Sequence, residues 1–232
     1  MTQIIEKLRG GLIVSCQAPE DSPLNDPYVI SAMALAAERH GAAGVRINGP
    51  ENIRATRQRV SIPIIGIEKV VSEESPVYIT PTFAAAERLK ASGADIIALD
   101  ATRRPRPDGD KIEDLISRIQ GRLELPVMAD IATLEEGLFV SDWGADIVAT
   151  TLCGYTEETR GEDLPAFGLL QSLTKRLDVP VICEGGLGTP DDVERAFDIG
   201  AFAVVVGTAI TGIDQLVKNF VAAAPAHREP VR

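Results

Sequence analysis

Pro63-Ile64-Ile65-Gly66-Ile67-Glu68-Lys69 is an apolar segment of strand length that ends in a charged pair. Such near-continuous apolar runs are typical of parallel strands that are buried on both faces. A lysine at the rim of a buried sheet is poorly solvated, which lowers its pKa and frees the amine to act as a base or a nucleophile. A strand end that extends into water explains the same residues, so this segment by itself leaves both interpretations open.

Similar apolar segments recur along the chain and alternate with helical patterns. The expected strands are 11–17, 44–48, 63–69, 95–102, 126–131, 147–152, 180–186 and 203–207. The expected helices are 27–40, 51–60, 83–92, 112–121, one that begins after Thr133, 164–177, 191–199 and 213–223, and residues 1–10 also have a helical pattern. Thr133 and Glu136 have the spacing of a capping box, in which each side chain accepts a hydrogen bond from the other residue's backbone.

An internal repeat indicates how these elements are arranged. Gly-Ala pairs precede the even-numbered strands at 41–42, 93–94, 144–145 and 200–201, so they recur after 52, 51 and 56 residues. Pro63, Pro126 and Pro180 begin the third, fifth and seventh strands. Four occurrences of a two-strand, two-helix unit predict a single (β/α)8 (TIM) barrel. We therefore expect one domain over residues 1–232, with 226–232 as a flexible tail.

A doubly wound dinucleotide-binding sheet is disfavoured, because Cys16-Gln17-Ala18-Pro19 follows the first strand where that fold has a glycine-rich turn. The charge excludes other classes of partner. The chain has 34 acidic and 23 basic residues, a net charge of −11, so it would repel nucleic acid and anionic membrane surfaces. It has no secretory h-region and no apolar run of the roughly 20 residues that span a membrane.

Cysteine and histidine usage narrows the chemistry. The three cysteines, Cys16, Cys153 and Cys183, are an odd number inside or just past apolar strands, which indicates buried thiols in a reducing, cytoplasmic compartment. The two histidines, His40 and His227, lie outside the expected strands. Histidine catalysis and histidine-ligated zinc are therefore disfavoured, and no metal site is predicted.

In a barrel of this kind the active site lies at the carboxyl ends of the strands, the C-terminal face. The polar residues expected there are Gln17, Arg46, Asn48, Lys69, Asp100, Thr102, Asp130, Thr150, Thr151, Glu184, Gly207 and Thr208. Any one of them could simply be solvated. A set of Lys, Arg, Asp and Glu in otherwise apolar strands favours a catalytic interpretation.

Two glycine-containing turns suggest a phosphate site. Gly185-Gly186-Leu187-Gly188 follows the seventh strand, and Gly207-Thr208-Ala209 follows the eighth. Backbone N–H groups in these two loops hold phosphate in many barrels. Either turn alone is explained as an ordinary turn, but both together at these positions favour phosphate.

Several longer motifs, in this order, resemble the N-acetylmannosamine-6-phosphate 2-epimerase family over nearly the whole chain from Ser15 to the eighth strand. The most specific are Gly66-Ile67-Glu68-Lys69, Pro76-Val77-Tyr78-Ile79-Thr80-Pro81-Thr82, Ala98-Leu99-Asp100-Ala101-Thr102, Arg106-Pro107-Asp108-Gly109, Ala129-Asp130-Ile131, Thr150-Thr151-Leu152-Cys153-Gly154-Tyr155-Thr156 and Glu184-Gly185.

The resemblance implies a cofactor-independent barrel isomerase that interconverts N-acetylmannosamine 6-phosphate and N-acetylglucosamine 6-phosphate in sialic acid catabolism. It implies Lys69 as the catalytic lysine and Glu184 as its acidic partner. It implies substrate binding at Gln17, Arg46 and Asp130, and phosphate binding at Gly185, Gly186, Gly207 and Thr208. Members are often homodimers, so we expect a homodimer. We also expect its ligand to be a small sugar phosphate.

This chain departs from the family pattern at two places. Val70-Val71 replaces an Arg-Asp pair that often follows the lysine, and Gly212 replaces an arginine that can contact phosphate. Without that arginine, phosphate binding passes to backbone groups and to another cation, for which Arg103, Arg104 and Arg106 are the candidates.

The mechanism expected from these residues is removal and return of the proton at C2 of the ring-opened sugar. Lys69 would act as base and Glu184 as acid, while Arg46 would keep Lys69 unprotonated and stabilise the oxyanion. Two alternatives remain at this level: a Schiff-base lyase that acts on a phosphorylated keto acid, and a non-catalytic barrel that binds a sugar phosphate.

Overall fold

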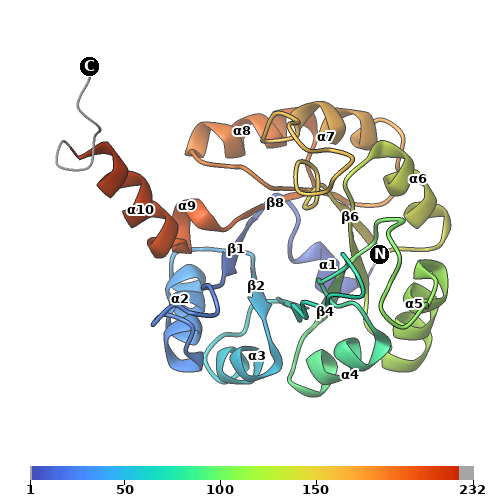
Figure 1. Ribbon diagram of the computed structural model, residues 1–232, viewed down its shortest axis with the longest axis horizontal. Coiled ribbons are helices and arrows are strands. Elements are labelled where there is room, and N and C mark those ends of the chain that lie inside the picture. Colours follow the sequence, from blue (N-terminus) through green and yellow to red (C-terminus); the bar gives the residue numbers. More distant parts are fainter. Residues whose placement is uncertain (1, 225–232) are drawn as a thin grey trace.

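The computed structural model describes residues 2–224 and closes eight parallel strands into a barrel (Figure 1). The strands follow one another around the barrel in chain order, and β8 pairs with β1. They are β1 (Leu12–Cys16), β2 (Gly44–Asn48), β3 (Ile64–Ile67), β4 (Ile96–Asp100), β5 (Val127–Asp130), β6 (Ile147–Ala149), β7 (Val181–Glu184) and β8 (Ala203–Val206). The predicted (β/α)8 barrel is confirmed.

Helices cover the outside of the barrel between successive strands. They are α2 (Pro27–Arg39), α3 (Pro50–Arg57), α4 (Phe83–Ala91), α5 (Ile112–Arg118), α6 (Leu134–Asp142), α7 (Phe167–Thr174) and α8 (Pro190–Ile199), and α5 continues into a π-helical turn, η1 (Ile119–Leu123). The predicted capping box at Thr133 and Glu136 is present at the start of α6. The tail expected over 226–232 lies outside the described residues.

The barrel interior is filled by every second side chain of the strands, as the period of two along a strand requires. The interior cluster includes Ile13, Ile65, Ile67, Ile96, Ala98, Met128, Ile147, Ala149, Ile182, Ala203 and Val205. Ile5 and Leu8, from α1 (Gln3–Glu6) and the turn after it, pack into the same cluster beside Phe202. This packing closes the amino-terminal end of the barrel, which leaves the opposite end for a site.

Some boundaries differ from the expected ones for local reasons. β3 ends at Ile67, so Lys69 lies beyond the strand, where it pairs with Ile79 in an isolated antiparallel bridge. α7 begins at Phe167 and not at 164, because Leu164 precedes Pro165 and a residue before proline is disfavoured in helical conformation. A four-residue helix, α9 (Thr208–Thr211), follows β8 and was not predicted.

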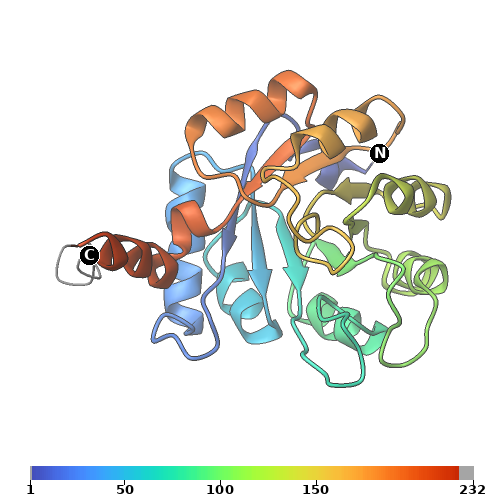
Figure 2. The same cartoon turned by 45° about the horizontal axis from the view of Figure 1, so that its top comes forward.

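The last helix, α10 (Ile213–Ala223), does not cover the barrel. It has no buried residue, and Figures 1 and 2 show it leading away from the ring of strands. Among residues 2–224, no helix is long and apolar enough to cross a membrane.

Gly66→Ala should destabilise the fold, because a Cβ at this strand position would lie 2.8 Å from Ala94 Cβ and 3.0 Å from Ile53 Cδ1. Overpacking of this kind costs about 1–3 kcal/mol, which urea unfolding followed by circular dichroism would measure. Gly121→Ala is the control, since a Cβ there meets nothing within 4 Å. Equal stability of the two variants would contradict the packing described for β3.

Candidate active site

The polar residues at the carboxyl end of the barrel are the inward positions that follow its apolar interior. Counting by twos from the interior residues reaches Ser15 in β1, Asp100 in β4, Asp130 in β5 and Glu184 in β7. In β2, Val45 and Ile47 pack in the outer core, so Arg46 between them is the inward position. The same count reaches Lys69, Thr151 and Gly207 just past β3, β6 and β8. Strand register therefore brings together residues that lie far apart in sequence.

Arg46 is the centre of this group. Its Nη1 and Nη2 atoms donate to Asp130 Oδ1 and Oδ2 at 3.0 and 2.6 Å, and Nη1 also donates to Glu184 Oε2 at 2.8 Å. The Arg46 and Asp130 side chains are 1 % and 0 % exposed, so both lie beneath the floor of the pocket. Burial alone would lower the pKa of Arg46, but the charges of Asp130 and Glu184 outweigh it and raise that pKa.

Glu184 reaches from this ion pair into the open pocket. Thr151 Oγ1 lies 2.7 Å from Asp130 Oδ1 and 3.1 Å from Glu184 Oε2, so one hydroxyl bridges the two carboxyl groups. Burial raises the pKa of Glu184 to about 7, and the Asp130 charge adds to the rise, while Arg46 and the Thr151 hydrogen bond oppose it. Glu184 therefore exchanges its proton near neutral pH.

Lys69 borders the same pocket and keeps solvent-accessible surface on the open side, although protein surrounds it on the others. Desolvation by that protein lowers the pKa of Lys69, and the Arg46 charge lowers it further. The charges of Glu184 and Asp130 act in the opposite direction and raise it. Within residues 2–224 the Lys69 amine makes no ion pair, since its nitrogen lies beyond 4.0 Å from any carboxylate oxygen. The gap leaves room for a ligand between the amine and Glu184.

The segment that carries Lys69 is held from several sides. Lys69 N–H donates to Asn48 Oδ1, and Thr80 N–H donates to the Glu68 carbonyl. Thr80 has φ 44°, a conformation that a β-branched residue adopts only when its surroundings impose it. Those surroundings are visible: Thr80 Oγ1 donates to the Ala98 carbonyl at 2.6 Å, and the buried Arg106 donates to the Thr80 carbonyl.

The two glycine turns line the pocket with Lys69 and Glu184, in a cavity of about 430 Å³ that Tyr78 and Tyr155 also border. Gly185 and Gly186 have φ of 107° and 76°, and a Cβ at Gly186 would lie 2.5 Å from Leu164 Cβ. Within the described chain, the backbone N–H groups of Gly185, Gly186, Gly207 and Thr208 donate to no other protein group.

Gln17 lines an adjoining part of the pocket with Lys69 and Thr208. Its Nε2 donates to Ser15 Oγ at 2.6 Å, and its Oε1 is buried without a partner. All the predicted site residues thus gather at one end of the barrel. Their roles stay predictions. Arg46 and Asp130 have almost no exposed surface through which they could contact a substrate directly.

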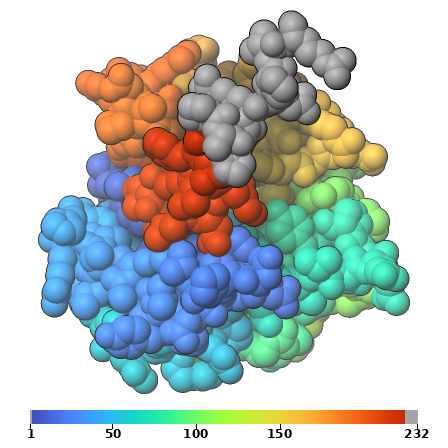
Figure 3. All heavy atoms as spheres, turned by 60° about the vertical axis from the view of Figure 1, so that its left-hand side comes forward, coloured from blue at the N-terminus to red at the C-terminus, as the bar shows by residue number. Residues whose placement is uncertain are grey.

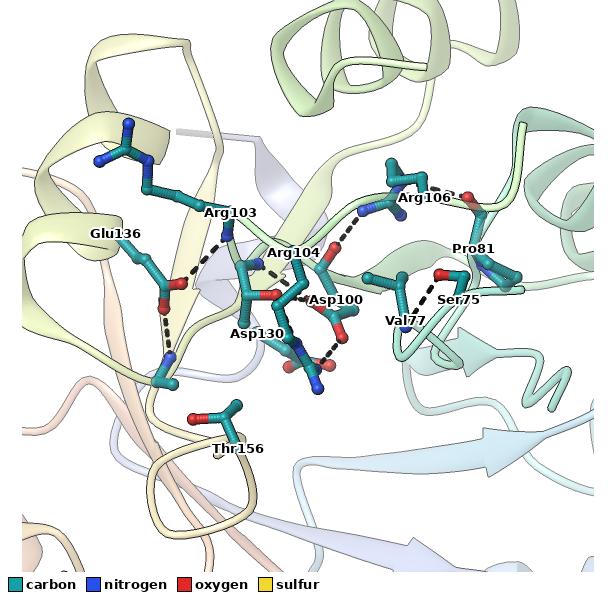
Figure 4. Close-up of polar contacts among 12 residues, drawn as sticks. Ser75, Val77, Pro81, Asp100, Arg103, Arg104, Arg106, Asp130, Glu136 and Thr156 are labelled. Carbon is teal, nitrogen blue, oxygen red and sulfur yellow. Dashed lines mark hydrogen bonds and ion pairs between the residues drawn. The ribbon is translucent and has the colours of Figure 1, made fainter. Parts of the chain in front are cut away.

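The three arginines of the loop after β4 make their polar contacts near the carboxyl end of β4 (Figure 4). Arg103 lies over the Phe139 ring, and Arg106 donates to the carbonyls of Asp100, Thr80 and Pro81. Arg104 pairs with Asp100 at 2.6 Å. None of the three makes a contact with residues 185–188 or 207–212 in the described part of the chain.

Sequence reasoning did not select Ser15, Tyr78 or Tyr155 as site residues. The period of two along β1 would have identified Ser15 as inward-facing, since Ile13 belongs to the barrel interior. No local pattern identifies Tyr78, which lies outside the barrel strands and reaches the pocket through the bridge at Lys69. In residues 2–224, no three His, Cys, Asp or Glu side chains are grouped so that they could hold a metal ion.

Fold and geometry together define a class: a (β/α)8 barrel with an amine and a readily protonated carboxyl on one pocket at its C-terminal face. The comparisons agree with that class. Residues 30–226 match the family model described as "Putative N-acetylmannosamine-6-phosphate epimerase". The chain belongs to this family.

Two similar relatives carry the corresponding name, "Putative N-acetylmannosamine-6-phosphate 2-epimerase". The protein from Synechococcus elongatus is 52 % identical over 97 % of both chains. The protein from Thermosynechococcus vestitus is 53 % identical over 96 % of this chain and 97 % of its own. The solved structure of the N-acetylmannosamine-6-phosphate 2-epimerase from Clostridium perfringens has a TM-score of 0.92 at 40 % identity, covering 96 % of this chain and 97 % of that one.

The Glu184 carboxyl should titrate near pH 7 in a carbon-13 NMR titration, with the signal assigned by its loss in Glu184→Gln. Glu38 is the reference: a hydrogen bond from the Ser61 side chain lowers its pKa from 4.5, so it should titrate below that value. The folded protein holds the Glu184 proton more tightly than the unfolded chain does. Burial of Glu184 therefore costs no stability below about pH 4.5, where the carboxyl is protonated in both states, and the cost grows as the pH rises to about 7. A Glu184 midpoint near that of Glu38 would contradict the burial described.

Proposed function

We propose that the protein is a cofactor-independent isomerase that interconverts N-acetylmannosamine 6-phosphate and N-acetylglucosamine 6-phosphate. The observation that carries this proposal is the pair formed by Lys69 and Glu184. They lie on one pocket without a direct ion pair, and burial moves their pKa values toward each other. Inversion at a carbon beside a carbonyl requires such a base and acid.

The reaction begins from the ring-opened sugar, in which C2 lies beside the C1 aldehyde. The neutral Lys69 amine takes the C2 proton, and the electrons of the C–H bond move into the carbonyl to form an enolate. Glu184, as the carboxylic acid, returns a proton to the opposite face of C2 and becomes a carboxylate. Transfer of the proton from the Lys69 ammonium to Glu184 restores the starting state.

Charge balance supports this cycle. A neutral amine with a carboxylic acid has the same net charge as an ammonium with a carboxylate, so the reset moves no net charge. Arg46 opposes protonation of Lys69 and favours negative charge developing nearby. Because Arg46 and Asp130 are buried, they act on the substrate through Lys69 and Glu184.

The phosphate is assigned to the free N–H groups of Gly185, Gly186, Gly207 and Thr208. The absence of an arginine at 212 fits the local packing, because a Cβ at Gly212 would lie 2.7 Å from Thr208 Cα and 2.8 Å from Thr208 O. Backbone donors without a cation would hold phosphate more weakly than the family pattern does.

Of the alternatives, family membership disfavours the Schiff-base lyase and the non-catalytic barrel. Borohydride reduction in the presence of substrate separates them, since a lyase would be labelled covalently at Lys69 and an epimerase would not. We also infer a place in sialic acid catabolism and in the cytoplasm, which the resemblance and the three free, buried cysteines support.

Lys69→Ala should all but abolish epimerisation, with a loss of about 10²–10⁴-fold, the contribution of a general acid–base group. Proton NMR in heavy water would follow both the conversion of N-acetylmannosamine 6-phosphate and deuterium entry at C2. Lys175→Ala, at the exposed end of α7, is the control and should keep full activity. Near-normal turnover by Lys69→Ala, or turnover without deuterium at C2, would contradict the mechanism.

Glu184→Gln should uncouple the two halves of the reaction. With Lys69 intact and the acid removed, the C2 proton of one epimer should still exchange with solvent while conversion to the other epimer falls by about 10²-fold or more. The same heavy-water spectra measure both rates. If exchange and conversion fall together, a single base serves both faces and the role assigned to Glu184 is wrong.

We also propose that the protein is a homodimer in which α10 of each copy packs on the other. Ile213, Val217, Phe220 and Val221 of α10 are 47, 54, 78 and 44 % exposed, and their spacing puts them on one helix face. Figure 3, which brings the left-hand side of Figure 1 forward, shows α10 (red) in front of the barrel. An apolar face of this size on a helix with no buried residue needs a partner.

The same molecule offers a matching surface. An apolar groove of about 340 Å³ lies beside β1 and α2, lined mainly by Leu12, Val14, Met33, Ala36 and Ala37. A helix that followed β8 directly would cover this region, but α10 turns away after Gly212. If each copy inserts its α10 into the groove of the other, the two-fold axis forms the same contact twice and both grooves are filled.

Sedimentation equilibrium at micromolar concentration should give a dimer for the natural protein and a monomer for Val217→Asp/Phe220→Asp, which puts charges on the apolar face. Ala222→Asp adds an acid on the opposite, exposed face of α10 and should remain dimeric. A monomeric natural protein would overturn the proposal, and so would a double variant that stays dimeric.

A further inference from the structure

Arg104 is a cation fixed at the carboxyl end of β4, where it lines a cavity with Thr102, Arg103 and Arg106. Its charge acts on Tyr78, which borders the neighbouring pocket of Lys69 and Glu184. Its Nη2 donates to Asp100 Oδ2 at 2.6 Å and its Nε to Thr102 Oγ1 at 3.0 Å. In Figure 4 its side chain extends toward Asp100 and Asp130, while those of Arg103 and Arg106 extend elsewhere. Arg104 is 24 % exposed although Asp100 beneath it is fully buried.

The loop around Arg104 is pinned on both sides. Arg103 N–H donates to Glu136 Oε1, and Ser75 Oγ donates to the Pro105 carbonyl. Arg106 Nη1 donates to the Asp100 carbonyl at 2.6 Å. The Arg104 guanidinium is therefore held in one place before any ligand arrives, so a ligand need not order it.

Two polar groups in this sector lack protein partners. Arg104 Nη1 makes no hydrogen bond within the described chain, and neither does the Tyr78 hydroxyl. Tyr78 borders the pocket with Lys69 and Glu184, and its phenol senses the charges of Asp130, Asp100, Arg104 and Arg46. Burial raises the Tyr78 pKa, so the hydroxyl keeps its proton.

The carboxylates of the sector are closed to a ligand. Asp100 and Asp130 are both 0 % exposed. Asp100 accepts hydrogen bonds from Thr102 and Arg104, and Asp130 accepts them from Arg46 and Thr151. The groups left open to a ligand here are thus the Arg104 donors and the Tyr78 hydroxyl.

The proposed substrate has one group to place in this sector. Its phosphate is on C6, assigned to the turns after β7 and β8, and its C2 lies between Lys69 and Glu184. The acetamido group on C2 is at the other end of the carbon chain from the phosphate. With the phosphate on the glycine turns, the side of C2 away from those turns faces Lys69 and Tyr78, next to the carboxyl end of β4.

We propose that Arg104 and Tyr78 form the binding subsite for the acetamido group, and that Arg104 selects N-acetylated over unacetylated hexosamine phosphates. This inference rests on the proposed function. The carbonyl oxygen of an acetamide accepts hydrogen bonds from both groups. An unacetylated sugar presents an ammonium, which only donates and meets a guanidinium that also only donates. Selection then arises from an unfavourable contact with the wrong ligand as well as from a favourable one with the right ligand.

Calorimetry with N-acetylglucosamine 6-phosphate and glucosamine 6-phosphate tests the subsite without turnover. Arg104→Met keeps the length of the side chain and removes its donors. It should weaken binding of the acetylated ligand about 10- to 100-fold, the value of a charged hydrogen bond, and leave the unacetylated ligand unchanged or bound more tightly. Tyr78→Phe, which removes a hydroxyl with no protein partner, should weaken only the acetylated ligand, by about 2- to 10-fold.

Two further variants keep the test decisive. Arg103→Met is the matched control, because that side chain lies over Phe139, and it should change neither affinity. Asp100→Asn/Arg104→Met removes both charges of the pair, so a loss of selectivity there cannot come from an unpaired buried carboxylate. Equal losses for both ligands in the Arg104 variants would overturn the subsite. Absence of C2 exchange in the natural enzyme would instead overturn the proposed function, whatever the selectivity shows.

Discussion

The ion pairs of Arg46 are the interaction on which the rest of the site depends. A guanidinium that is 1 % exposed loses its hydration, at a cost of several kcal/mol, and only well-placed carboxylates offset that cost. Asp130 meets it with two parallel hydrogen bonds, and Glu184 supplies a third contact. The same charge that needs these partners fixes the orientation of Glu184 and disfavours protonation of Lys69. A structural requirement thus sets the chemical properties of both proposed catalytic groups.

The barrel supplies the surroundings that give this network its effect. Its interior below Arg46 is apolar and its far end is closed by Ile5 and Leu8. Burial is the largest cause of both pKa shifts, and it acts in opposite directions because it disfavours the charged form of each group. Burial thus shifts both groups toward their uncharged forms, the amine and the carboxylic acid. The Arg106 hydrogen bonds, which hold Thr80 and the Lys69 segment, keep the amine at its place on the pocket wall.

Gly212 connects two features of the chain, the missing arginine at position 212 and the outward course of α10. It caps both α9 and α10, and its lack of a Cβ permits the close approach to Thr208 at the junction where α10 leaves the barrel. Position 212, where the family resemblance led us to expect a phosphate-binding arginine, is therefore a point of close packing. Asp214, at the start of α10, accepts a hydrogen bond from Ser22 in the loop after β1, so the packing of α10 bears directly on the wall of the pocket.

The alternation of strands and helices and the capping box followed from the sequence, because apolar periodicity, helix-ending glycines and capping residues act within a few residues. The closed barrel followed from the repeat of Gly-Ala pairs every 51 to 56 residues. Strand ends also identified Lys69, Arg46, Asp130 and Glu184. Tertiary structure alone decided that Arg46 and Asp130 lie beneath the pocket floor, since their contact joins residues 84 apart. It also brought Tyr78 to the pocket and sent α10 outward. These outcomes depend on barrel register and on packing between distant segments, which no local pattern of residues specifies.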